Sequence, residues 1–410
     1  MCVTIFLEEK LLIHRKRILL ITNNGGGVNS GFASRVKLMA KTIHKNIGEV
    51  TLIRFYPMFR ADGSWARDEF ARIVNVVEIP VFPMSRIALF RELSFFFANI
   101  IIHFYSAIKG IDCIQAESHE AAHVVLKRRL SATPVVVDYH GAVTEEAAFS
   151  IDKTEGNVNK TWHSEAEQNS LKADAHFFVS EELRNYFEKK YNYFGWKNSH
   201  IIPINVDEEF FNRKKRSSMR HGMHLRENDI LFVYSGGCQK YQCINEMIEI
   251  FFQLRREIEN IKLLILTMDI GLFKSAIDKD YYYNNLDEII FRTAKNKCEV
   301  ADYLSAADYA FLLRKNVVLN RVACPTKFGE YLASGVPVIS TPWSGHAPKI
   351  IKKRDVGLLI DFHEDYLTKI KKYLEKGRLD PLRLQEIARE EVHWVKSENT
   401  IINFYSKFLR

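Results

Sequence analysis

Short apolar runs alternate with stretches of helical periodicity along the first half of the chain. Runs rich in Val, Ile, Leu and Phe predict strands at residues 18–22, 50–55, 113–116, 135–138 and 176–180. After the first run, large apolar residues recur at the spacing of one helix face, at Phe32, Val36, Met39, Ala40 and Ile43. Strands that alternate with helices in this way predict a parallel, doubly wound α/β sheet.

The alternation stops and then restarts near residue 206. An extended stretch at 201–207 is followed by a basic polar segment at 213–220. A new strand at 230–234 then leads through a glycine turn into a helix at 244–256, and more apolar runs predict strands at 262–267, 288–291, 309–313, 336–340 and 357–360. The pattern predicts two α/β domains, residues 1–205 and 206–393. Because ligands of open α/β sheets bind beyond the carboxyl ends of the strands, we expect the functional site in a cleft between the domains.

The composition agrees with a globular protein of two or three domains. The 410 residues are 47% hydrophobic and 26% charged, and 58 basic residues against 50 acidic ones give a formal net charge of +8. This charge indicates an anionic partner. No basic patch is interleaved with aromatic residues, so nucleic acid is not the partner we expect.

The cysteines and the N-terminal residues predict a reducing compartment. The six cysteines form no C-x-x-C pair, which argues against a disulfide scaffold or a structural zinc site and favours free, buried thiols. The first 17 residues contain no signal-peptide hydrophobic region, because Glu8 and Glu9 interrupt the apolar run. We therefore expect a cytoplasmic protein.

One segment raises the question of membrane contact. Residues 93–108 carry no charge and are bracketed by Arg91 and Lys109. The segment is shorter than the roughly 20 residues of a membrane span, and it contains Asn99 and His103. A helix buried between a sheet and its neighbours is the favoured interpretation. The alternative is a helix in the interface of an anionic membrane, with nearby Arg and Lys facing the lipid.

A glycine-rich loop follows the first predicted strand. It contains Gly26, Gly27 and Asn29, and its spacing differs from that of the G-x-G-x-x-G dinucleotide motif. Glycines let a backbone approach a ligand closely, and the next helix offers free N–H groups at its start. The loop is either a tight turn or a contact for phosphate or the acceptor.

His119, Glu120 and His123 match the H-E-x-x-H zinc-protease motif. A catalytic zinc ion needs a third protein ligand. The nearest candidates lie beyond the following strand and are His140, Glu145 and Glu146. We therefore expect polar residues at the start of a helix that faces the cleft, and no metal site.

The residues around Glu330 point to a nucleotide. Pro325 suits the first turn of a helix and Gly335 its end, so Glu330 lies on a short helix that starts at the cleft. A carboxylate there can accept both hydroxyls of a ribose, and the helix N-terminus attracts phosphate. Lys327 and Arg314 add positive charge.

Residues 325–339, PTKFGEYLASGVPVI, resemble the nucleotide-sugar signature of retaining GT-B glycosyltransferases, glycosyltransferase family 4 in particular. Three more segments resemble that family in the expected order. They are the first donor-domain loop at 234–242, the histidine turn at 138–141 and the strand at 173–180. The resemblance implies a GT-B fold, in which two Rossmann-like domains face each other. Residues 1–205 would be the acceptor side and 206–393 the donor domain, and a last helix over about 394–410 would pack back on the first domain.

The resemblance also implies roles for single residues. Glu330 matches the second Glu of the family's Glu-x7-Glu motif, which binds the ribose, but the first Glu would fall at Val322. The motif is thus incomplete, which leaves Asn320 or Arg321 to hold sugar hydroxyls. His140 matches the histidine that faces the donor sugar. The expected catalytic residues are His140, Lys240 and Lys327. The expected donor-binding residues are Glu330, Arg314, Asn320, Arg321, Thr326 and Gly237.

The implied activity is that of a retaining hexosyltransferase. It would move a sugar from a nucleoside-diphosphate donor to a glycan or lipid-linked acceptor in surface polysaccharide or glycoconjugate biosynthesis. It would need no metal and no cofactor besides the donor, and would act in the cytoplasm or at the inner face of the membrane. The alternatives are a GT-B nucleotide-sugar epimerase, a non-catalytic nucleotide-sugar-binding protein and, from a different class, an H-E-x-x-H metalloprotease.

Overall fold

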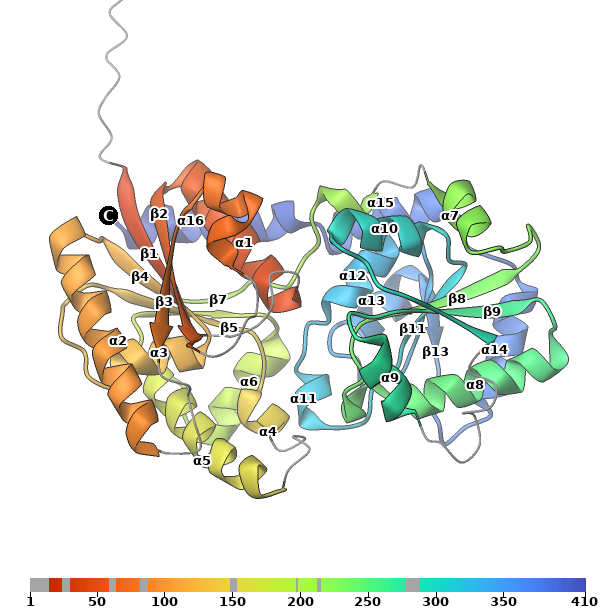
Figure 1. The fold of residues 1–410 in the computed structure, drawn as a ribbon, viewed down its shortest axis with the longest axis horizontal. Coiled ribbons are helices and arrows are strands. Elements are labelled where there is room, and N and C mark those ends of the chain that lie inside the picture. Colours follow the sequence, from red (N-terminus) through yellow and green to blue (C-terminus); the bar gives the residue numbers. More distant parts are fainter. Residues whose placement is uncertain are drawn as a thin grey trace, which may run out of the picture.

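The computed structural model contains two α/β domains that lie side by side (Figure 1). It describes residues 15–23, 30–58, 64–81, 88–147, 153–196, 198–211, 215–277 and 288–410. Each domain is built on one parallel sheet with helices on both faces. The predicted fold class, two facing doubly wound domains, is confirmed.

The N-terminal domain has a seven-stranded parallel sheet in the order β3-β2-β1-β4-β5-β6-β7. Its strands are β1 (Lys16–Thr22), β2 (Gly48–Pro57), β3 (Asn75–Val81), β4 (Cys113–Glu117), β5 (Val135–Tyr139), β6 (Ala175–Phe178) and β7 (Ser199–Ile201). Its helices are α1 (Gly31–Asn46), α2 (Ala88–Lys109), α3 (His119–Leu126), α4 (Val143–Ala147), α5 (Lys153–Ser170) and α6 (Glu181–Tyr191). Every residue of β4 and β5 is buried, because helices cover both faces of the sheet.

The C-terminal domain has a six-stranded parallel sheet in the order β10-β9-β8-β11-β12-β13. Its strands are β8 (Ile230–Ser235), β9 (Ile261–Leu266), β10 (Ile289–Arg292), β11 (Tyr309–Leu312), β12 (Val338–Ser340) and β13 (Gly357–Leu359). Its helices are α7 (Arg216–Gly222), α8 (Ile244–Glu257), α9 (Ile270–Ala276), α10 (Lys297–Ser305), α11 (Val318–Arg321), α12 (Thr326–Ala333), α13 (Ala347–Arg354), α14 (Tyr366–Glu375) and α15 (Pro381–Glu391).

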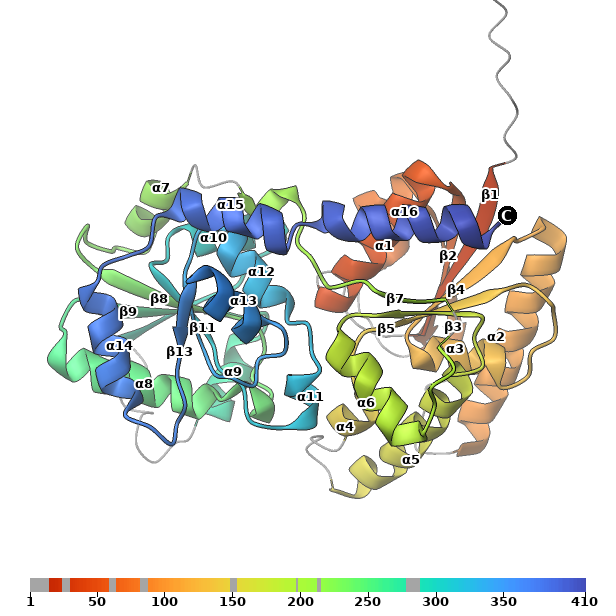
Figure 2. The ribbon, with the colours of Figure 1, turned by 180° about the vertical axis from the view of Figure 1, so that it is seen from behind.

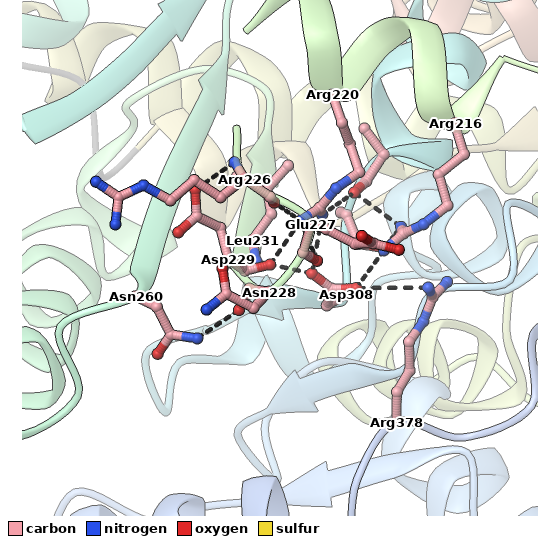
Figure 3. Close-up of polar contacts among 12 residues, drawn as sticks. Arg216, Arg220, Arg226, Glu227, Asn228, Asp229, Leu231, Asn260, Asp308 and Arg378 are labelled. Atoms are coloured by element: carbon pink, nitrogen blue, oxygen red, sulfur yellow. Dashed lines mark hydrogen bonds and ion pairs between the residues drawn. The ribbon is translucent and has the colours of Figure 1, made fainter. Parts of the chain in front are cut away.

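A cluster of arginines around Asp308 fastens the start of this domain to its sheet (Figure 3). The Asp308 carboxylate accepts hydrogen bonds from Arg216 at 2.5 Å, Arg220 at 3.2 Å and Arg378 at 3.4 Å. It also accepts from the backbone N–H of Leu231 in β8, at 2.8 Å. Because Asp308 immediately precedes β11, the cluster ties α7 and the segment after α14 to the middle of the sheet.

The last helix, α16 (Trp394–Phe408), returns to the N-terminal domain and lies beside α1 (Figure 2). Trp394 Nε1 donates to Thr42 Oγ1 at 2.9 Å, and Asn205 Nδ2 donates to Ser397 Oγ at 3.0 Å. The chain therefore crosses between the domains twice, near residue 206 and before α16.

Helix α2 covers the segment for which the sequence left two interpretations. The favoured one, a helix buried between a sheet and its neighbours, is correct for one face of α2 and wrong for the other. Phe95 and Ile102 are buried, whereas Phe97, Phe104 and Ile108 are 56%, 67% and 63% exposed. Among the described residues, no helix is long and apolar enough to cross a membrane.

Candidate functional site

In the N-terminal domain, the loop after β5 places His140 among charged groups. His140 Nε2 lies 3.2 Å from Asp138 Oδ2 and 3.4 Å from Glu117 Oε2, and its ring packs on Phe32 with the centroids 4.8 Å apart. Arg35, from α1, donates two hydrogen bonds of 2.8 Å to the Asp138 carboxylate. The cluster thus joins α1 to the carboxyl ends of β4 and β5, where a ligand of this sheet is expected.

The charges of this cluster favour a protonated His140. Burial alone would lower the pKa of His140, but Asp138 and Glu117 raise it above its usual value. Burial alone would raise the pKa of Asp138, but Arg35 and His140 hold it well below its usual range. Asp138 and Glu117 thus favour the charged form of the imidazole at this edge of the sheet.

Arg35 and Glu117 were missed by the sequence reasoning, although Arg35 left a signal. It lies on the apolar face of α1, three residues after Phe32 and four before Met39. An arginine on a buried helix face needs a buried acidic partner. Both Arg35 and Asp138 are fully buried.

In the C-terminal domain, Gln242 brings two cationic side chains together. Its Oε1 accepts from Lys327 Nζ at 2.6 Å and from Arg314 Nη1 at 3.1 Å. Lys327 also donates to Tyr234 at 3.1 Å and lies 4.4 Å from the centre of that ring. Burial and the nearby Arg314 lower the pKa of Lys327 well below its usual value, although Glu330 opposes the shift. An anion placed here would supply the countercharge that Lys327 lacks.

Gly236, directly after β8, allows Lys327 to reach this position. Its φ of +136° is one that side chains rarely adopt, and a Cβ on it would lie 2.1 Å from Lys327 Nζ. Only a residue without a side chain leaves this space free. Gly237, the glycine that the sequence predicted at this site, has a different role: its carbonyl accepts from the Tyr234 hydroxyl at 2.6 Å.

Glu330 lies one turn after Lys327 on α12. Its carboxylate forms no hydrogen bond or ion pair with the described residues. Burial raises the pKa of Glu330 to about 7, while Lys297 and Lys327 lower it and Asp207 adds to the rise. Lys297, which the sequence reasoning missed, forms an ion pair with Asp207 at 2.8 Å. A carboxylate with this pKa titrates near neutral pH.

Comparisons with known proteins agree with this geometry. Residues 216–391, which hold the Lys327 cluster and Glu330, match the family model of glycosyl transferases group 1. We refer to the C-terminal domain, which carries this match, as the group 1 domain. No curated protein matches the chain.

Solved structures match over nearly the whole chain. Sucrose-phosphate synthase from Thermosynechococcus elongatus is 17% identical with a TM-score of 0.71, over 96% of this chain and 99% of that one. HepE from Anabaena, in complex with UDP-glucose, is 14% identical with a TM-score of 0.70, over 95% and 99%. WaaG, a glycosyltransferase involved in lipopolysaccharide biosynthesis, is 13% identical with a TM-score of 0.62, over 96% and 95%. These matches show that the chain has the GT-B fold.

Three other residues expected to bind the donor lie at different places in the group 1 domain. Asn320 is buried, and its amide donates to the carbonyls of Lys315 at 2.9 Å and Tyr241 at 3.1 Å. Arg321 is exposed and donates to Asn316 at 2.6 Å. Thr326 starts α12, and its hydroxyl lies 3.3 Å from the point that a Cβ on Gly31 of α1 would occupy. Thr326 therefore lies where the two domains meet.

Lys240 stands apart from the other two expected catalytic residues. It begins a short 3-10 turn, η4 (Lys240–Gln242), and its side chain is exposed. Within the described residues it forms no hydrogen bond or ion pair. The expected phosphate or acceptor loop of Gly26, Gly27 and Asn29 lies outside the residues that the structure describes.

Val322, at the position of the absent first Glu, packs into the core of the N-terminal domain. It is 6% exposed, and its carbonyl accepts from Ser180 Oγ at 2.6 Å. Two residues on, Cys324 Sγ accepts from the backbone N–H of Ile204 at 3.1 Å. The segment between α11 and α12 is thus a contact between the domains.

The H-E-x-x-H residues do not converge on one point. His123 contacts Asn169 Nδ2 at 3.2 Å, whereas His119 and Glu120 lie near His163 of α5, with Glu120 Oε1 3.2 Å from His163 Nδ1. Burial lowers the pKa of both His119 and His163 to about 3 and raises that of Glu120 to about 7. Among the described residues, His163 joins His119 and Glu120 in a group whose atoms could hold a metal ion, and none of the sequence candidates His140, Glu145 and Glu146 joins that group. A protease zinc site needs both motif histidines on one ion, and His123 does not join the set.

Proposed function

We propose that the protein is a retaining glycosyltransferase that uses a nucleoside-diphosphate sugar as its donor. The observation that carries the proposal is the pair of cations, Lys327 and Arg314, held together by the neutral Gln242 beside Glu330. A diphosphate would neutralise both cations, and Glu330 would accept the ribose hydroxyls. The HepE structures, which contain UDP-glucose or UDP, support a donor of this class.

The chemistry would be a front-face displacement. The bond between the sugar C1 and the diphosphate oxygen breaks while the acceptor oxygen bonds to C1 on the same face. The acceptor proton leaves with the diphosphate. Negative charge grows on the leaving diphosphate, where Lys327, Arg314 and the start of α12 would stabilise it. His140, from the other domain, would hold the donor sugar, and Lys240 would reach the phosphates from the loop after β8.

The reaction would need no divalent metal ion, because these side chains supply the positive charge. We therefore expect transfer to continue in EDTA. Loss of activity in EDTA, restored by a divalent cation, would contradict this part of the proposal.

The acceptor would be a glycan or a lipid-linked glycan precursor of a surface polysaccharide or glycoconjugate. The role of WaaG in lipopolysaccharide biosynthesis supports this class. Such acceptors are made at the inner face of the membrane, so we propose a cytoplasmic protein that contacts an anionic membrane peripherally.

A thermal-shift panel of UDP, GDP, ADP and their sugars tests the donor class. One base should raise the melting temperature of the wild type and fail to do so in Glu330→Ala. Glu386→Ala, which removes an exposed carboxylate from α15, is the matched control and should respond like the wild type. No response to any nucleotide would contradict the proposal.

Product analysis separates the enzymatic alternatives. Incubation of the selected sugar nucleotide without acceptor should leave its sugar unchanged, whereas an epimerase would convert it. Transfer to an acceptor would exclude a non-catalytic binding protein.

A further inference from the structure

The exposed face of α2 is apolar along its whole length. Of the 17 large apolar side chains that are exposed in the described residues, nine lie on this helix. Leu89, Phe97, Phe104 and Ile108 are the most open, at 56–67% exposure. At 1.5 Å per residue, the 22 residues of α2 make a face about 33 Å long. A continuous patch of this kind marks an interaction surface.

The polar residues of α2 lie on its other side. Asn99 Nδ2 donates to the carbonyl of Val124 at 2.7 Å, and His103 Nδ1 lies 3.0 Å from Ser131 Oγ. Both residues are buried. Asn99 and His103 thus form their hydrogen bonds inside the protein, while large apolar side chains of the same helix are exposed.

Cations border this face. The exposed Arg128 lies over the Phe96 ring, 5.5 Å from its centre, and has no acidic partner among the described residues. Lys109 closes the C-terminal end of α2 and is also exposed. Lys127 does not add free charge, because it is paired with Glu92 at 2.9 Å and with Glu165 at 3.1 Å. The free charge beside the apolar face is thus positive, which complements a phosphate-bearing surface.

A pocket of about 280 Å³ opens between α2 and the end of α3. Leu89, Leu93 and Phe96 of the exposed face form its apolar wall. The charged residues that line it are Arg128 and the ion pair of Glu92 and Lys127. This combination suits an apolar chain that carries a phosphate at one end. A second copy of the protein would cover the apolar face but would not explain a pocket that places the arginine Arg128 beside apolar walls.

We propose that α2 and this pocket form a binding site for anionic phospholipids. The apolar face of α2 enters the acyl region of one leaflet, while Arg128 contacts phosphates. Helix α2 lies on the outer side of the N-terminal domain, away from the group 1 domain in both views (Figures 1 and 2). A membrane there leaves the space between the domains open to the donor.

This site locates the peripheral membrane contact of the proposed function on named residues. It rests on the proposed function only for its biological purpose. Its test contains no sugar nucleotide, so failure of lipid binding and failure of glycosyl transfer are distinguishable.

Flotation of the full chain with vesicles tests the site. The wild type should float with phosphatidylcholine mixed with phosphatidylglycerol, and much less with phosphatidylcholine alone. The double variant Phe97→Asp/Phe104→Asp should lose binding about tenfold or more, because charged groups cannot enter the acyl region. Arg128→Glu should lose the preference for the anionic lipid.

The control is Phe194→Asp/Leu382→Asp, which places the same charges at side chains that are 71% and 66% exposed elsewhere. It should float like the wild type. All variants change exposed positions, so their urea unfolding should match the wild type. Failure of the wild type to float, or equal flotation of the α2 double variant, would overturn the proposal. So would a lipid-free dimer in sedimentation that this variant turns into monomers, because a second copy would then cover the face.

Discussion

Replacing Gly236 with alanine tests how the group 1 domain holds Lys327. The new Cβ would lie 2.1 Å from Lys327 Nζ and 2.4 Å from its Cε. No heavy atoms approach this closely, so the ammonium must leave its place beside Gln242 and Tyr234. The protein can still fold, because the atoms displaced are the far end of a flexible side chain.

The substitution should have two separate effects, one on the stability of the protein and one on its affinity for the donor. The positive φ of +136° costs an alanine about 1–3 kcal/mol in the free energy of unfolding. Moving Lys327 removes a hydrogen bond between charged groups from the donor complex, worth about 1.5–3 kcal/mol. We therefore expect the donor Kd to rise about 10- to 150-fold.

Titration calorimetry with the nucleoside diphosphate selected by the thermal-shift panel measures the change in Kd, and urea unfolding measures the change in stability. Gly377→Ala is the control for backbone strain, because its φ is +77° and no atom lies within 4 Å of the added Cβ. Gly222→Ala adds a Cβ with neither strain nor contact. Both controls should bind the nucleotide like the wild type.

An unchanged Kd in Gly236→Ala would refute the reasoning, provided that Lys327→Ala binds weakly. It would mean that Lys327 meets the diphosphate from a different position. Equal loss of affinity in Gly377→Ala would instead assign the effect to general destabilisation.

Four further results are expected. Donor affinity should rise up to about tenfold between about pH 6 and pH 8 as Glu330 ionises, and calorimetry of Glu330→Gln should show a flatter profile. His140→Ala should lower kcat about a hundredfold or more with little change in donor Kd, because in the proposed function it removes the group that would hold the reacting sugar. Arg35→Met should lower the free energy of unfolding by about 3–5 kcal/mol in urea, since it leaves Asp138 buried without its partner, and a loss below about 1 kcal/mol would contradict this. Val322→Glu should cost about 2 kcal/mol or more and should not tighten donor binding, because the new carboxylate would be buried in the N-terminal domain.

The buried strands were the easiest part of the fold to predict from sequence. In a parallel sheet covered on both faces, strands such as β4 and β5 appear as unbroken apolar runs. Strand β3, at the sheet edge, is mostly half-exposed and contains Pro80, and β7 has only three residues. Neither has a pattern that differs from a loop, so both were missed.

Some residues of the candidate site could be predicted from local sequence, and others could not. Lys327 and Glu330 were found because they share one short helix, and Arg314 because it ends a strand. Gly236 and Gln242 were missed because their importance depends on contacts with residues more than 70 positions away. For α2, periodicity predicts an apolar face but not what covers it, and the buried-helix interpretation failed on one face for that reason.

Val322 shows why an incomplete motif does not by itself indicate a lost activity. The position that the family pattern gives to a carboxylate is occupied here by a residue of the interdomain contact, with Ser180 bonded to its carbonyl. Lys327 follows five residues later, at the start of the next helix. The segment that leads to Lys327 is therefore fastened directly to the N-terminal domain. A diphosphate bound at Lys327 would contact a segment that both domains already hold in place. Less of the chain would then have to become ordered when the donor binds, which would compensate for the carboxylate that is missing at Val322.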